Sequence, residues 1–172
     1  MDKENINKEN PMRKIKIEKM ILSVSGTGED LERGVKLLAF LSNKKPVKTK
    51  AKKRIPSFSI RPGLEIGAMV TIRKNPEEIL KKMLAAIDNT LKKKQIKTNH
   101  FSFGIKEYLD IPGIEYQREI GVMGLDVTVV FKRAGKRVKI KKQKRGKIPK
   151  RQMVTKEEII KFMEDNFNTQ FR

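Results

Sequence analysis

The sequence predicts an α+β fold: a single layer of mostly antiparallel sheet with helices packed on one face, plus a basic loop and a basic C-terminal extension. Four segments alternate apolar and polar residues, which is typical of strands with one buried and one hydrated face. Three others carry apolar residues at helical spacing. The 172 residues, 37% of them hydrophobic, suit one domain with a modest core.

Residues 19–41 are expected to form a strand and then a helix. Apolar and polar side chains alternate from 19 to 26, and from 29 to 41 the apolar residues recur at helical spacing behind an acidic first turn. Gly34 lowers the propensity of this helix by up to about 1 kcal/mol. Gly26 and Gly28 are interpreted as turn glycines, because SGTGEDLERG lacks the Gly-Lys-Ser/Thr ending of a phosphate-binding loop.

A second strand and helix are expected over residues 65–91. EIGAMVTIR alternates as a strand does, and Asn75-Pro76-Glu77-Glu78 then supplies a capping residue, a proline at the first helical position and acids in the first turn. The apolar stripe of the helix consists of Ile79, Leu80, Met83, Leu84, Ile87 and Leu91.

Two more strands and a helix complete the prediction. HFSFGI and GLDVTVVF alternate and are separated by a loop containing DIPGIEY. Thr155 and Glu158 form a capping box at the start of the last helix. Residues 1–11 are polar and are interpreted as a flexible lead, so the domain is expected to span residues 12–172.

The charge balance indicates a polyanionic partner. The chain has 41 basic and 20 acidic residues, a formal charge of +21, and such self-repulsion is tolerated when phosphates neutralise it. No apolar run approaches the roughly 20 residues that span a bilayer, so no membrane partner is expected. The absence of cysteine excludes disulfides and thiolate metal sites and fits an intracellular protein.

Two segments without acids concentrate this charge. Lys44–Arg54 has seven basic residues in eleven, and Lys132–Arg151 has twelve in twenty. A solvated tail is the alternative for either one. Because Val47 is interspersed in the first and Val138, Ile140 and Ile148 in the second, extended segments that pack on something while presenting charge to RNA or DNA are favoured.

Catalysis is not predicted. His100 is the sole histidine, and no cysteine can accompany it. One acidic region allows paired-carboxylate chemistry with Mg²⁺ as an alternative, although a solvated loop explains it better: Glu107, Asp110, Glu115, Glu119 and Asp126. We therefore expect no enzyme activity, no catalytic residue, no metal and no cofactor.

The aromatic residues leave one candidate for contact with RNA. Phe101 and Phe103 share a strand face and are expected in the core. Phe58 lies in IPSFSIRPG beside Arg61, where two prolines restrict the backbone, and an exposed ring there suits an RNA partner. The alternative is that Phe58 folds back onto its own domain.

Three stretches resemble one known family: KPVKTKAKKRIPSFSIRPGLEIGAMVTIR, NHFSFGIKEYLDIPGIEY and EIGVMGLDVTVVF. It is the universal large-subunit ribosomal protein of the central protuberance, numbered five in bacteria and eleven in eukaryotes. The similarity is collinear from about Pro11 to Phe167, and the tail KIPKRQMVTKEEIIKFMED resembles the archaeal and eukaryotic branch.

The resemblance implies a cytoplasmic, non-catalytic ribosomal protein that binds 5S rRNA and large-subunit rRNA and reaches toward the P-site tRNA. Neighbouring proteins of the central protuberance and the small-subunit head are further implied partners. Together with the charge pattern, it gives these rRNA-binding candidates: Lys44, Lys45, Lys48, Thr49, Lys50, Lys52, Lys53, Arg54, Thr71, Arg73, Lys136, Arg137, Lys139, Lys141, Lys142, Lys144, Arg145, Lys147, Lys150 and Arg151. The implied tRNA-facing loop, residues 55–63, contributes Pro56, Ser57, Phe58, Ser59, Ile60, Arg61, Pro62 and Gly63.

The chain departs from the family pattern at several positions. Asn43-Lys44 stands where the family usually has Gly-Gln, Ser59 replaces a glycine, and the usual Thr-Gly-Asn turn is missing before His100. A free-standing RNA-binding or RNA-chaperone module with the same charge pattern remains the alternative to a ribosomal protein.

Overall fold

The computed structural model describes residues 10–172, so most of the predicted lead at residues 1–11 lies outside the described residues. The strands are β1 (Lys16–Ser25), β2 (Val47–Lys50), β3 (Glu65–Ile72), β4 (Thr90–Leu91), β5 (Ile96–Lys97), β6 (His100–Ile105), β7 (Leu125–Lys132) and β8 (Gln170–Phe171). The α-helices are α2 (Glu29–Ser42), α3 (Pro76–Ala85), α4 (Arg137–Ile140) and α5 (Lys156–Phe167). Short 3-10 turns are η1 (Pro56–Phe58), η2 (Lys93–Gln95), η3 (Tyr108–Asp110) and η4 (Lys150–Gln152).

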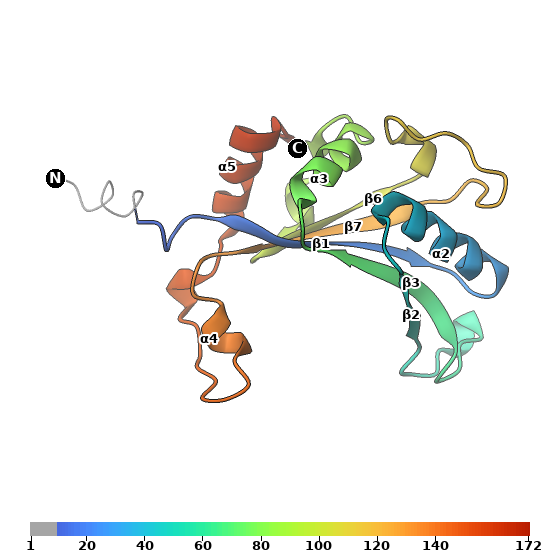
Figure 1. Cartoon of the computed structure of the whole chain (residues 1–172), viewed down its shortest axis with the longest axis horizontal. Coiled ribbons are helices and arrows are strands. Elements are labelled where there is room, and N and C mark those ends of the chain that lie inside the picture. The colour runs from blue at the N-terminus through green and yellow to red at the C-terminus, as the bar shows by residue number, and fades with distance from the viewer. Residues whose placement is uncertain (1–9) are drawn as a thin grey trace.

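The main sheet has six strands in the order β2-β3-β1-β7-β6-β5, and each neighbouring pair is antiparallel. Helices α2, α3 and α5 lie on one side of it, whereas α4 lies on the other side near one end (Figure 1). The predicted α+β fold is therefore confirmed. Within residues 10–172 no helix is both long and apolar enough to cross a membrane.

The pairing register of β1 with β3 and β7 decides which side chains share each face of the sheet. Met20 lies opposite Ile72 and Val129, and all three are buried beneath the helices. Ile21 lies opposite Thr71 and Thr128 on the other face, where they are only partly buried. We call this second face, which β2 and β6 extend, the open face.

Helix α2 lies close to β1 at Gly34. A Cβ atom at this position would approach Cγ1 of the buried Val24 to 2.8 Å. The absence of a side chain at Gly34 thus permits the helix to approach the strand. From the sequence alone, only the unfavourable helix propensity of this glycine was predicted.

The two predicted helix starts have different outcomes. At α5 the capping box is confirmed, since the Thr155 side chain accepts from the Glu158 backbone and the Glu158 side chain accepts from the Thr155 backbone. At α3 the proline is at the first turn as predicted, but Asn75 adopts a left-handed conformation and its side chain makes no capping hydrogen bond. The prediction that Asn75 caps this helix is wrong.

Two further expectations are also wrong. The predicted stripe of α3 extends past the helix end at Ala85, and Leu91 instead lies in β4, which pairs in parallel with the C-terminal β8. Residues 132–151 are expected from the sequence to be extended, but they fold back through α4 and η4. We call residues 133–153 the basic hook.

Substitution Gly34→Ala is expected to lower the free energy of unfolding by about 1–3 kcal/mol, because the added methyl overpacks against Val24. In an exposed helix the same change would stabilise by about 1 kcal/mol. Urea denaturation measures the difference.

The double variant Val24→Ala/Gly34→Ala is the control, since it removes the contacted methyl groups. Measured against Val24→Ala alone, the methyl added at position 34 is expected to cost less than it does in the presence of Val24. A stabilised Gly34→Ala protein would contradict the close approach of helix and strand.

Candidate nucleic-acid interface

The open face carries small polar side chains across several strands. Ser23 lies opposite Asp126, and Thr128 lies opposite Ser102, in the register of β1, β7 and β6. A shallow hollow of about 360 Å³ lies among them. Small hydroxyl side chains leave the backbone accessible and can donate to phosphate or sugar oxygens.

Two predicted threonines lie on this face. Thr49 of β2 pairs with Gly67, and its hydroxyl donates to the Gly67 carbonyl at 3.1 Å. Thr71 of β3 is partly exposed opposite Ile21, and the exposed Arg73 follows the end of that strand. Thr49 and Thr71, both predicted to contact 5S rRNA, thus share one side of the sheet.

Lys48 faces the other way. It pairs with Ala68, whose side chain is buried on the helix side, and its ammonium group forms ion pairs with Glu32 of α2 and with Glu65, the latter at 3.4 Å. The hydrogen bond to Glu32 is the main cause of a raised Lys48 pKa, while desolvation opposes it. Lys48 therefore stays protonated through neutral pH and is occupied by two carboxylates of its own chain.

The other basic candidates of this segment are free to meet a polyanion. They are all exposed: Lys44, Lys45, Lys50, Lys52, Lys53 and Arg54. Because they surround the β2 edge of the open face, they extend its positive charge beyond the sheet.

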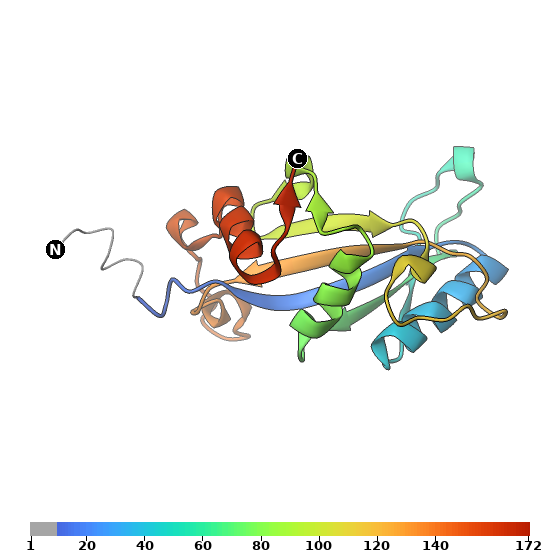
Figure 2. The same ribbon diagram turned by 90° about the horizontal axis from the view of Figure 1, so that it is seen from above.

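Residues 55–63 form the tip of a hairpin that projects from the body (Figure 2). Ile55 and Ile60 exchange two backbone hydrogen bonds of 3.0 and 3.1 Å, and Ala51 bonds to Gly63 and Leu64 at the base. Phe58 at the tip is 74% exposed, so of the two alternatives left open by the sequence the ring does not fold back onto its own domain.

Two of the departures from the family pattern, at Asn43 and Ser59, fall where the backbone conformation favours glycine. Asn43, at the C-terminus of α2, has φ +50°, and Ser59 in the hairpin tip has φ +53°. Asparagine tolerates this left-handed region well, but serine does so less readily. Ser59 therefore holds the tip in a conformation that a glycine would adopt without strain.

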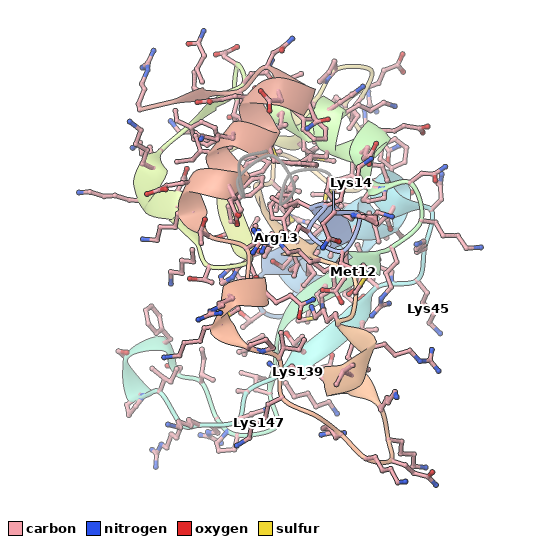
Figure 3. All side chains as sticks on the ribbon, turned by 90° about the vertical axis from the view of Figure 1, so that its left-hand side faces the viewer. Met12, Arg13, Lys14, Lys45, Lys139 and Lys147 are labelled. Atoms are coloured by element: carbon pink, nitrogen blue, oxygen red, sulfur yellow. The ribbon has the colours of Figure 1, made fainter. Side chains whose placement is uncertain are left out.

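The basic hook is anchored to the body by two ion pairs. Buried Arg133 pairs with Glu158 of α5 through Nη2 and donates from Nη1 to the Arg151 carbonyl at 3.1 Å. Lys136 pairs with Glu18 of β1. Figure 3 shows Lys139 and Lys147 in the part of the hook that faces the viewer at this end of the molecule.

Asn99 and Gln152 complete the anchorage, and sequence reasoning missed both. The Asn99 side chain accepts from the Val154 backbone at 2.8 Å, and the Gln152 amide donates to the Ala134 carbonyl at 3.2 Å. One sequence feature near Asn99 could have drawn attention to it: the Thr-Gly-Asn turn that is usual in the family is missing before His100.

Most predicted hook residues present their charge to solvent. Lys136 is engaged with Glu18, but the others are exposed: Arg137, Lys139, Lys141, Lys142, Lys144, Arg145, Lys147, Lys150 and Arg151. The open face thus lies between two basic borders, the β2 segment and the hook (Figure 1).

The acidic residues considered for catalysis do not assemble. In the described part of the chain, no three His, Cys, Asp or Glu side chains form a group that could hold a metal ion. Glu119 instead pairs with Lys36 of α2 at 2.7 Å, and this hydrogen bond lowers the pKa of its carboxyl. That pairing favours the folded state above the ordinary glutamate pKa and fades as the pH falls through the lowered value.

Comparison with known proteins agrees with this arrangement. Residues 10–61 match the family model described as ribosomal protein L5, and residues 65–162 match the model of the C-terminus of the same ribosomal family. The chain belongs to the ribosomal protein L5 family. The first match ends within the exposed hairpin tip, at residue 61, and the second begins with β3 at residue 65.

Several archaeal members of the L5 family are similar over nearly their whole length. Large ribosomal subunit protein uL5 of Nanoarchaeum equitans is 45% identical over 94% of this chain and 98% of its own. Its counterpart from Sulfolobus acidocaldarius is 40% identical over 98% and 97%, respectively. These archaeal relatives are named as ribosomal proteins, which confirms the predictions of a non-catalytic protein and of the archaeal and eukaryotic branch.

Substitution Glu158→Ala is expected to lower the free energy of unfolding by about 3 kcal/mol or more, because it leaves the buried Arg133 without its carboxylate and also removes half of the capping box. Chemical denaturation at neutral pH measures this loss.

Glu157→Ala is the matched control, because Glu157 is an exposed acid in the same helical turn. It is expected to cost less than about 1 kcal/mol. Equal costs for the two variants would show that the ion pair does not anchor the hook.

Proposed function

We propose that the chain is a structural constituent of the large ribosomal subunit, where it binds 5S rRNA and large-subunit rRNA in the central protuberance. In this proposal the hairpin tip at residues 55–63 extends toward the P-site tRNA. Other proteins of the central protuberance and of the small-subunit head are its neighbours, and the protein works on cytoplasmic ribosomes.

One observation carries the proposal: within residues 10–172, α4 at one end is the sole helix on the open-face side of the sheet, and this face is bordered by two basic segments that contain no acid. A surface of this kind gathers phosphates along both borders and presents hydroxyl groups between them. Family membership supports rRNA as the polyanion, because the relatives are named as proteins of the large ribosomal subunit.

The proposal is tested by the affinity of the purified full chain for 5S rRNA and for an unrelated RNA duplex of equal length at physiological salt. We expect markedly tighter binding to 5S rRNA, and sedimentation of the protein with large subunits. Equal affinity for both RNAs would instead support a free-standing, nonspecific RNA-binding module.

Salt titrations of two lysine variants refine this test. Lys52→Met is expected to reduce the slope of log K against log salt concentration by about 1, because the exposed Lys52 ammonium is free to neutralise a phosphate. Lys48→Met is the matched control and is expected to change the slope less, since Lys48 is already paired with Glu32 and Glu65. A larger effect of Lys48→Met would contradict the assignment of the open face.

Substitution Phe58→Ala tests the hairpin tip separately. The ring is exposed, so the free energy of unfolding is expected to change by no more than about 0.5 kcal/mol and 5S rRNA affinity to stay the same. P-site tRNA binding by subunits carrying the variant is expected to weaken, because an aromatic contact with nucleic acid contributes about 1–3 kcal/mol.

Phe40→Ala, which removes another partly exposed ring from α2, serves as the control for tRNA binding. Unchanged P-site tRNA binding by the Phe58→Ala subunits would contradict the proposal that the hairpin tip contacts this tRNA.

A further inference from the structure

The basic hook encloses a cavity of about 630 Å³ between itself and the end of β7. This volume falls within the range of about 300–1,000 Å³ that is typical of small-molecule sites. Two ion pairs between residues distant in sequence hold the hook in the position that forms this cavity: Glu18 with Lys136, and Glu158 with Arg133.

The walls of the cavity combine two kinds of chemistry. Ala134, Ile148 and Met153 contribute apolar surface, which exceeds the polar surface of the lining, and the buried Phe131 lies behind them. A site for phosphate alone needs donors and positive charge and gains nothing from such surface. A ligand with a flat apolar part, such as a nucleobase, does gain from it, and the Met153 thioether suits contact with an aromatic ring.

The lining also supplies positive charge. Lys139, Arg145, Lys147 and Lys150 all line the cavity and all are exposed to solvent. In the described chain none of their ammonium or guanidinium groups pairs with a carboxylate, in contrast with Lys136. Ammonium and guanidinium groups at the edge of an apolar cavity match the two parts of a nucleotide, with phosphate outside and base inside.

The interior contributes polar groups that remain available to a base. Asn99 and Gln152 line the cavity, and each uses only one end of its amide in the hydrogen bonds described above. Arg133 also lines it, but its Nη groups are engaged by Glu158 and the Arg151 carbonyl, and its Nε is buried out of reach of a ligand. The free ends of the two amides are therefore the interior groups that can pair with donor and acceptor atoms of a base.

We propose that this cavity receives one unstacked nucleotide of an RNA strand, with its base against the apolar wall and its phosphates against the lysines. Bases inside a duplex cannot enter a recess of this kind, whereas a bulged or looped-out base can. The inference rests on the proposed function for the identity of the polymer, which would be rRNA, but the cavity can be tested with a free nucleotide.

The test uses the full chain labelled with ¹³C at its methionine methyl groups and titrated with AMP, ribose 5-phosphate or inorganic phosphate at low salt. Met153 lines the cavity, whereas Met83 is buried in α3 and Met123 lies in the loop before β7, so both serve as internal controls. The Met153 signal is assigned by Met153→Leu. We expect AMP to shift it saturably, with Met83 and Met123 unmoved, and the two phosphates without a base to bind at least about tenfold more weakly.

Two variants locate the effect. Ala134→Phe should fill the cavity and abolish the shift, and Lys147→Met should weaken AMP binding by roughly tenfold through loss of a charge-assisted contact. Lys142→Met makes the same change in the hook outside the cavity and is expected to leave AMP affinity within about twofold.

Three results would overturn the inference: no Met153 shift with AMP, an equal response to inorganic phosphate, or equal losses for Lys147→Met and Lys142→Met. Failure of the proposed function is distinguishable, because 5S rRNA discrimination can be lost while the AMP response at Met153 persists, or the reverse.

Discussion

The one-sided covering of the six-stranded sheet is the constraint on which the other features depend. Helices α2 and α3 pack on the face that contains Met20 and Ile72, so the apolar core is complete without any layer on the opposite face. An uncovered sheet face must be compatible with water in the free protein. The serines and threonines of the open face meet that requirement and at the same time provide hydroxyl donors for a polar partner.

Charge is distributed around this sheet so that the scarce acids stabilise and the abundant bases remain available. Glu32 and Glu65 engage Lys48 on the helix side, and Glu18 and Glu158 hold the basic hook. Each of these carboxylates joins separate segments of the chain. The remaining lysines of both basic segments point to solvent, where their mutual repulsion can be relieved by phosphates.

The sequence predicted those parts of the fold that depend on neighbours along the chain. Alternation identified β1, β3, β6 and β7, and the capping box identified the start of α5, since both patterns are local. Asn75 shows the limit of this reasoning: its type suits a cap, but its left-handed backbone turns the side chain away from that role. Leu91 continues a helical pattern by spacing alone, yet pairing of β4 with the C-terminal β8 decides its conformation.

The candidate site was predictable as composition but not as geometry. The two basic segments stand out in the sequence, and Thr71 and Arg73 follow from the family resemblance. The direction of Lys48 depends on its register with Ala68, and the cavity in the hook depends on Lys136 meeting Glu18 across 118 residues. No local pattern encodes contacts of that kind. Gly34 illustrates the same point within the core, because the need for a residue without a side chain follows only from its contact with Val24 of β1.

If the hook binds RNA as proposed, its anchoring in the free protein has a consequence for affinity. A disordered basic tail would lose conformational entropy when it binds, and that loss would reduce the net binding free energy. In this chain the ion pairs of Arg133 and Lys136 order the hook during folding, against the repulsion among its own lysines. The cost of holding these charges together is therefore borne by the folded protein, so that more of the phosphate attraction remains available for binding RNA.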